Sequence, residues 1–154
     1  MRANRPALSR PAIATALLLT LGACSSAAQA ASYTMFRDPS CGCCEQWAGH
    51  IRRGMDTAIE VRDSAEMEAV KDRHGVPDML RSCHTMVVEG YVIEGHVPAA
   101  DVKRLLAERP EGVAGLAVPG MPLGSPGMKM GDRTQPFEIV AFGERAPFVF
   151  NRYD

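Results

Sequence analysis

The chain has 154 residues, of which 46% are hydrophobic and 23% charged, and its formal net charge is −1 at pH 7. This length supports one globular domain with its own core. Aromatic residues make up only 6% of the chain, and no basic patch or interleaved aromatic run accompanies them, so we do not expect a nucleic-acid partner.

The N-terminal segment over residues 1–30 is predicted to be a signal peptide. Three arginines (Arg2, Arg5 and Arg10) precede the apolar run Pro11–Leu21, which suits a signal peptide and is too short to span a bilayer. Removing these arginines takes the formal charge from −1 to −4. We therefore expect an exported, periplasmic protein.

Two cleavage sites are compatible with this segment. Leu21-Gly22-Ala23-Cys24 has the form of a lipoprotein box, in which Cys24 would carry a lipid anchor. Ala28-Gln29-Ala30 is an ordinary signal peptidase site and would leave a mature domain over residues 31–154. A lipid at Cys24 would be the protein's one expected contact with a membrane.

The first half of the mature chain predicts alternating strands and helices. We expect strands at Tyr33–Phe36 and Ala58–Arg62, and helices at Cys43–Arg53 and Ser64–His74. Gly54 and Gly75 are the expected helix stops, and Asp38 or Ser40 the expected cap of the first helix. This βαβα order favours a parallel pair of strands joined by a helix.

The second half predicts a hairpin, a helix, a loop and a second hairpin. The expected elements are strands His84–Val88 and Tyr91–Glu94, a helix from Val97 through Ala107, a Gly/Pro/Met-rich loop over Val118–Gly131, and strands Phe137–Phe142 and Phe148–Asn151. The predicted fold class is α/β, thioredoxin-like, with a mixed central sheet, flanking helices and a C-terminal β-hairpin extension.

The chemistry is concentrated in Cys41-Gly42-Cys43-Cys44. Cys41 and Cys44 form a C-x-x-C pair between a predicted strand and a predicted helix, which is the thioredoxin-type pattern. A helix N-terminus favours thiolate there and lowers a cysteine pKa. The third thiol, Cys43, exceeds what dithiol exchange needs and suits a soft metal ion.

The segment Ser82–Thr85 is predicted to complete the site. In a thioredoxin-like domain the segment that leads into the third strand crosses beside the C-x-x-C turn, where a proline is usual. Here the segment carries Cys83 and His84. Four sulfurs with an imidazole can hold zinc tetrahedrally or one or more Cu(I) ions, so this position counts against simple dithiol exchange.

The pairing of the cysteines stays open at this point. An exported compartment oxidises idle thiols. A Cys41–Cys44 disulfide is plausible, Cys83 could pair with any of the three, and the vicinal Cys43 and Cys44 are poorly placed to bond each other. Three cysteines in one helical turn make a poor structural staple, because they close almost no loop.

Histidines and methionines supply weaker candidate ligands, because imidazole and thioether both bind copper. His84 is the first of them, and His96, Met121 and Met128 rank below it. Trp47 is expected to pack beside the site and limit water access. The remaining expectations concern structure. His50 is expected to be an exposed or half-buried helix residue, and His74 to complement the dipole of its helix. The methionines expected in or partly in the core are Met35, Met55, Met67, Met79 and Met86.

Several long blocks of the sequence resemble the DUF411 family. They are Cys41–Cys44, Ser82–Thr85, Val88–Pro98 and Gly115–Met128, and the resemblance extends over about Tyr33 to Tyr153. The members of this family are small exported proteins, called CopG-like, with a thioredoxin-like fold and a link to copper resistance. The resemblance implies copper binding at Cys41, Cys43, Cys44 and Cys83, together with redox work on copper.

The expected function is therefore an exported copper-binding protein for copper tolerance. It would hold Cu(I), in a multinuclear cluster if several ions bridge the thiolates, and could cycle the copper redox state. Its expected partners are copper ions and periplasmic copper export or oxidase proteins. The alternatives are a periplasmic thiol–disulfide oxidoreductase, with Cys41 and Cys44 as catalytic residues, and a structural zinc-binding domain.

Overall fold

A computed structural model of the protein describes residues 33–154. The predicted signal peptide, with Cys24 and both cleavage sites, lies outside the described residues. Within residues 33–154, no helix has both the length and the apolar character needed to cross a bilayer. The elements are β1 (Tyr33–Arg37), α1 (Gly42–Met55), β2 (Ile59–Asp63), α2 (Met67–Arg73), the 3-10 helix η1 (Asp78–Leu80), β3 (His84–Val88), β4 (Tyr91–Glu94), α3 (Ala99–Glu108), β5 (Val113–Ala117), β6 (Phe137–Gly143) and β7 (Phe148–Tyr153).

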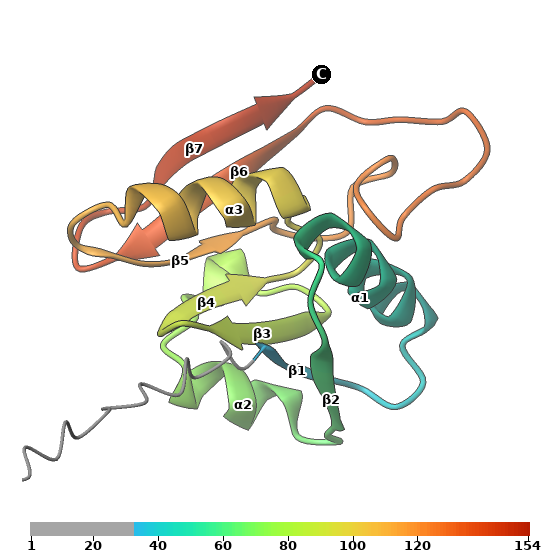
Figure 1. Cartoon of the computed structure of the whole chain (residues 1–154), viewed down its shortest axis with the longest axis horizontal. Coiled ribbons are helices and arrows are strands. Elements are labelled where there is room, and N and C mark those ends of the chain that lie inside the picture. The colour runs from blue at the N-terminus through green and yellow to red at the C-terminus, as the bar shows by residue number, and fades with distance from the viewer. Residues whose placement is uncertain (1–32) are drawn as a thin grey trace, which may run out of the picture.

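All seven strands form one mixed sheet in the order β2-β1-β3-β4-β5-β6-β7 (Figure 1). The pairs β1–β2 and β4–β5 are parallel, and the other neighbours are antiparallel. The β3–β4 hairpin turns at Glu89 and Gly90, which both have positive φ, as a two-residue turn of this kind requires. The α/β class, the parallel first pair and both hairpins are confirmed, and the thioredoxin-like assignment itself stays a prediction.

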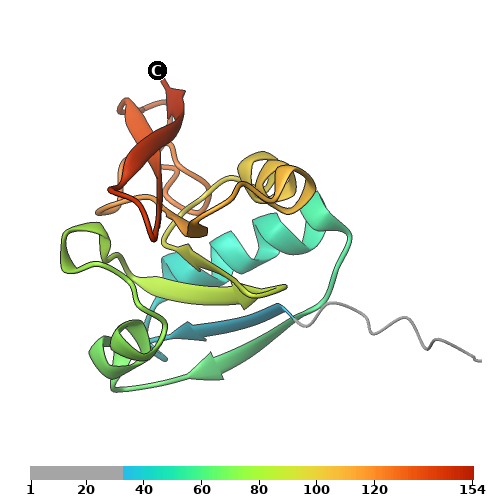
Figure 2. The same cartoon turned by 90° about the vertical axis from the view of Figure 1, so that its left-hand side faces the viewer.

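The two faces of the sheet are covered differently. Helices α1 and α3 pack against each other and cover one face (Figure 2). The main core lies there, with Trp47 and Ile51 of α1 and Leu105 of α3 fully buried. Because side chains alternate along a strand, Thr85 and Glu94 point to the other face, where Lys71 of α2 meets them.

Strand β5 is missing from the predicted elements, and its presence corrects the predicted architecture. It pairs with β4 on one side and β6 on the other, so the C-terminal hairpin continues the main sheet. The sequence does not show the pattern of a strand here, because Gly115, a residue of low strand propensity, lies at the centre of β5. The glycine is needed there, since a Cβ would lie 2.1 Å from the Val92 carbonyl oxygen.

Met35 and Met86 are fully buried as expected, but three expectations about helix ends and one about a methionine are wrong. Helix α1 runs past Gly54 to Met55, and Gly54 instead allows close approach to Ala99 of α3. Asp38 does not cap α1, because its carboxylate accepts hydrogen bonds from the amide and hydroxyl of Ser40. Helix α2 begins at Met67 rather than Ser64. Met79 is 77% exposed and lies outside the core.

Candidate metal centre

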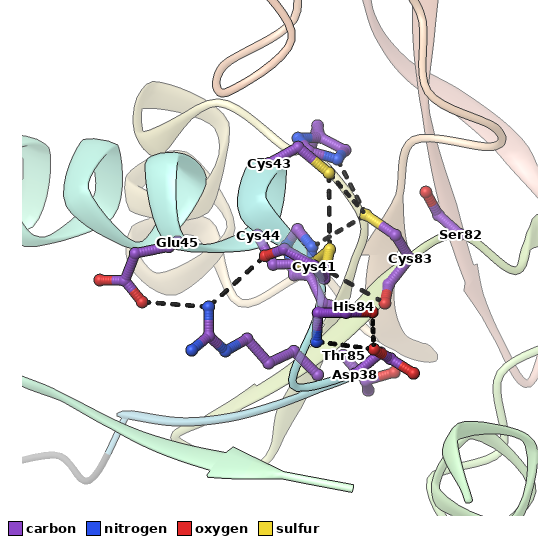
Figure 3. The surroundings of a disulfide bond; sticks show 12 residues. Asp38, Cys41, Cys43, Cys44, Glu45, Ser82, Cys83, His84 and Thr85 are labelled. Atoms are coloured by element: carbon purple, nitrogen blue, oxygen red, sulfur yellow. Dashed lines mark hydrogen bonds and ion pairs between the residues drawn. A yellow bond between two sulfur atoms is a disulfide. The ribbon is translucent and has the colours of Figure 1, made fainter. Parts of the chain in front are cut away.

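The candidate site lies where the start of α1 meets the start of β3. Cys41 is the N-cap of α1, and Cys43 and Cys44 lie in its first turn. Cys83 directly precedes β3, and Figure 3 shows its sulfur facing those of the α1 cysteines. The antiparallel pairing of β1 with β3, in which Arg37 lies opposite His84, brings the two segments together.

The four cysteines among residues 33–154 divide into one disulfide and two free thiols. Cys41 and Cys44 are disulfide-bonded, with their Cα atoms 5.4 Å apart. Cys43 and Cys83 are free. The Cys43 sulfur lies 3.5 Å from the Cys41 sulfur and 4.0 Å from the Cys83 sulfur. The site therefore offers two thiols with the disulfide closed and four when it is reduced.

His96 holds a ring nitrogen ready beside Cys83. Its Nδ1 lies 2.7 Å from the carbonyl oxygen of Pro126. A carbonyl only accepts, so we assign the proton to Nδ1, which leaves Nε2 unprotonated. That Nε2 lies 2.9 Å from the Cys83 sulfur and accepts its S–H. Burial lowers the pKa of His96 and favours this neutral form.

His84 contributes a second imidazole beside Cys83. Its Nδ1 lies 3.3 Å from the Cys83 sulfur, and its fully buried Nε2 has no hydrogen-bond partner among the described residues. The ring packs at 4.2 Å from the Trp47 ring and 5.1 Å from the His96 ring, between centroids. Burial is the main cause that holds the pKa of His84 well below its usual range, and electrostatic interactions with His96 and Lys71 act in the same direction.

The free thiol of Cys83 resists ionisation in the described state. Burial raises its pKa to about 12, and the neighbouring Cys43 adds to the shift. A bound cation would reverse this balance, because a metal ion stabilises thiolate and displaces the proton. The site is therefore poorly suited to nucleophilic attack through Cys83 and well suited to a soft cation.

Two overlapping ligand groups meet at Cys83. The four cysteines form one group and Cys83, His84 and His96 form the other, and within each group the ligand atoms lie within 4.8 Å of one another. Thiolate and imidazole donors at such spacing fit copper or zinc. All the residues predicted as first candidates, and His96, are thus brought together.

The Gly/Pro/Met loop packs over the site. Gly127 lies against α1, since a Cβ there would be 2.8 Å from the Cys43 carbonyl oxygen and 3.0 Å from the Trp47 amide nitrogen. The neighbouring Pro126 supplies the carbonyl that orients His96. Met128 is partly buried and Met121 is 52% exposed. Their role as ligands stays a prediction.

Trp47, which was expected beside the site, and the two remaining histidines have structural roles. Trp47 is fully buried, and its indole N–H donates to the Val97 carbonyl oxygen at 2.9 Å. His50 accepts a hydrogen bond from the Ala99 amide and so caps α3. His74 follows α2 and packs on Phe36 at 5.5 Å between ring centroids.

Sequence reasoning missed a buried ion pair directly behind Cys83. Lys71 and Glu94 are 2% and 0% exposed, and Lys71 Nζ lies 2.6 Å from Glu94 Oε1. The one signal in the sequence is a carboxylate at the end of an otherwise apolar strand, Tyr91–Glu94, immediately before Gly95 and His96. Its partner, 23 positions earlier in the chain, gives no local signal.

Together these features define a mixed α/β protein. At the N-terminus of α1 it carries a cluster of thiol and imidazole groups that could hold a metal ion. The profile of the family "Protein of unknown function, DUF411" matches residues 80–128. No curated protein matches the chain.

Two solved structures resemble the whole domain. "Copper resistance protein copG- Form 2" is 40% identical, with a TM-score of 0.75, and the match covers 80% of this chain and 98% of that one. "Copper resistance protein copG- Form 1" is 42% identical, with a TM-score of 0.70, covering 79% and 96%. The chain belongs to the DUF411 family of CopG-like proteins.

Proposed function

We propose that this protein is an exported copper-binding protein that serves copper tolerance by holding Cu(I) in its cysteine cluster. The observation that carries the proposal is the convergence of Cys41, Cys43, Cys44 and Cys83 within 4.8 Å, with two imidazoles beside Cys83. Solved structures named copper resistance proteins, 40% and 42% identical to this chain, support the choice of copper.

The donor atoms favour Cu(I) over Cu(II). Thiolates are soft ligands that select Cu(I), and the protein supplies them from a partly buried site. Cys43 and Cys83 bind the first ion, and reduction of the disulfide adds Cys41 and Cys44 for further ions bridged by sulfur. His96 and His84 complete the ligand set or orient the sulfurs.

The disulfide gives the site the means to change the copper oxidation state. When Cys41 and Cys44 are oxidised from two thiols to a disulfide, two electrons and two protons leave. Two Cu(II) ions accept those electrons and become two Cu(I) ions, so the reaction balances. Cys43 and Cys83 are then free to hold the Cu(I) product. The copper would be sequestered or passed to a periplasmic exporter or oxidase.

A thiol–disulfide oxidoreductase is the second candidate function. It is favoured by the closed Cys41–Cys44 disulfide at the start of α1, because a helix N-terminus stabilises the attacking thiolate. Such an enzyme would catalyse the reduction of insulin by dithiothreitol in the absence of metal. Inhibition by Cu(I) would show that both activities use the same thiols.

The test is an anaerobic Cu(I) titration of the fully reduced protein against a chromophoric chelator, with elemental analysis for copper and zinc. We expect more than one tightly held copper per chain, reduced in number or affinity in Cys83→Ser. Met79→Ser is the control, because it removes an exposed sulfur atom that does not belong to the cysteine cluster. No copper held against the chelator would overturn the proposal, and stoichiometric zinc instead would point to the structural zinc domain.

A further inference from the structure

The carboxylate of Glu94 makes three hydrogen bonds in a fully buried position. Its Oε1 accepts from Lys71 Nζ and from the Ser82 amide, each at 2.6 Å. Its Oε2 accepts from the Thr85 hydroxyl, also at 2.6 Å. Lys71 Nζ additionally donates to the Thr85 hydroxyl oxygen at 3.3 Å, which closes the network. We name these residues, Lys71, Ser82, Thr85 and Glu94, the Glu94 network.

The network holds the segment that carries Cys83 from both sides. Ser82 precedes Cys83 and Thr85 follows it by two positions, so one carboxylate binds the backbone before the thiol and the side chain after it. Thr85 is also the residue directly opposite Glu94 in the β3–β4 pairing. Residues 82–85 are therefore fastened to β4 through Glu94.

The imidazole of His96 and the thiol of Cys83 lie just beyond the end of the β3–β4 strand pair. The last backbone hydrogen bond between the two segments joins the Gly95 amide to the His84 carbonyl oxygen at 2.9 Å. Cys83 and His96 extend past that point, where paired strands tend to separate. The bond from Glu94 to the Ser82 amide adds a connection on the far side of Cys83.

From this geometry we infer that Glu94, with Lys71 as its counter-charge, is a positioning residue that sets the Cys83 sulfur against His96 Nε2 and the Cys43 sulfur. The inference rests on the proposed function only in naming the ion that the positioned thiol receives. The carboxylate does not contact the sulfur, so it acts through residues 82–85. The ammonium of Lys71 keeps the buried carboxylate paired, which it must be in such a place.

Two free thiols in different surroundings provide the internal comparison for a test. Cys83 lies in the segment that Glu94 holds, while Cys43 lies on α1, which has no bond to the Glu94 network. A general loss of stability exposes both thiols, because both then open by the same unfolding. Loss of positioning exposes Cys83 selectively.

The variants are Glu94→Ala, Glu94→Gln and Thr85→Val, made in the full chain with the disulfide closed. Asp101→Ala is the matched control, because Asp101 is also a buried carboxylate that accepts two side-chain hydrogen bonds, from Asn151 and Tyr153. That cluster has no contact with Cys83. Iodoacetamide labelling with peptide mapping gives separate rates for Cys43 and Cys83 and resolves Cys24.

In Glu94→Ala we expect the ratio of Cys83 to Cys43 labelling rates to rise about tenfold or more. Thr85→Val removes one of the three hydrogen bonds to the Glu94 carboxylate and should raise this ratio less. Glu94→Gln keeps an oxygen for the Ser82 amide, so it should stay within about threefold of the wild type. Asp101→Ala should lower thermal stability and leave the ratio unchanged.

The second readout is the Cu(I) affinity of the reduced variants. We expect a loss of about 10–100-fold in Glu94→Ala, as is usual when a residue that orients a ligand is removed. An unchanged labelling ratio in Glu94→Ala and Thr85→Val would overturn the inference, whether or not the protein binds copper. If Glu94→Ala does not fold, the same ratio in Thr85→Val decides. A wild-type protein that binds no Cu(I) would overturn the proposed function and leave the labelling test intact.

Discussion

The sulfurs of Cys43 and Cys83 lie 4.0 Å apart, although 40 positions separate the two residues in the chain. One belongs to the first turn of α1 and the other to the segment leading into β3. Because neither is part of the disulfide, this pair is the part of the site that can accept a soft ion in either redox state of the other two cysteines.

Reduction of the Cys41–Cys44 disulfide is expected to increase the copper capacity of the protein. The closed form offers two thiols and the open form four. We expect fewer copper ions per chain with the disulfide intact than after reduction, measured by elemental analysis of desalted samples loaded anaerobically with Cu(I). A Cys41→Ser/Cys44→Ser variant should bind the lower number under both conditions, and equal numbers in the wild type would contradict this prediction.

The raised pKa of Cys83 makes its reactivity and the stability of the fold depend on pH. Its pKa is about 12 in the fold and 9.0 in the absence of the protein environment. Alkylation of Cys83 in the metal-free protein should therefore be slow at pH 8 and should accelerate up to about pH 12. A pH series of labelling rates with peptide mapping tests this.

The same shift fixes the sign of the stability change. The buried neutral thiol contributes fully to the stability of the fold below pH 9. This contribution is lost as the pH rises toward 12, because the thiol ionises at a lower pH in the unfolded chain than in the fold. In Cys83→Ser the melting temperature should therefore fall less between pH 9 and pH 12 than it does in the wild type. An identical alkaline profile for the variant and the wild type would argue against the buried neutral thiol.

Trp47→Phe is expected to destabilise the fold more than it weakens metal binding. The substitution keeps most of the buried ring but removes the donor to the Val97 carbonyl oxygen. Loss of a buried partner of this kind costs about 1–3 kcal/mol, measurable by urea unfolding. Since no ligand is lost, Cu(I) affinity should fall less than in Cys83→Ser, and the reverse order would contradict the assigned role of Trp47.

Gly127→Ala is expected to lift the loop from the site. The position has a φ of +87° and no room for a Cβ, whereas Gly131 has a φ of +62° and nothing within 4 Å. Gly131→Ala is thus a control for backbone strain alone, at about 1–2 kcal/mol. Gly127→Ala should cost more and should also speed labelling of Cys83, because Pro126 no longer holds His96. Equal stability losses in the two variants would mean that the close contact with α1 is unimportant.

Local patterns were enough to predict most elements of the fold. The β3–β4 hairpin has a two-residue turn at Glu89 and Gly90 between apolar stretches, so its boundaries were predicted correctly. Strand β5 was not predicted, because its glycine is explained only by the carbonyl of Val92 across the sheet. A requirement set by a neighbouring strand leaves no periodic signal in the sequence.

The candidate site was predictable as far as its sulfurs are concerned. The expected crossing of residues 82–85 beside the C-x-x-C turn placed Cys83 and His84 near the other cysteines. The groups that orient the site were not predictable in the same way. The carbonyl of Pro126 and the ammonium of Lys71 reach His96 and Glu94 only through the tertiary fold.

The wide separation of Cys43 and Cys83 in the chain also means that a bridging ion would be a cross-link. The Cys41–Cys44 disulfide spans three positions and constrains the unfolded chain very little. An ion shared by Cys43 and Cys83 would close a loop of about forty residues that contains most of α1 together with β2, α2 and η1. Copper occupancy would then be measurable as a rise in melting temperature, because an ion that binds only the folded chain stabilises it.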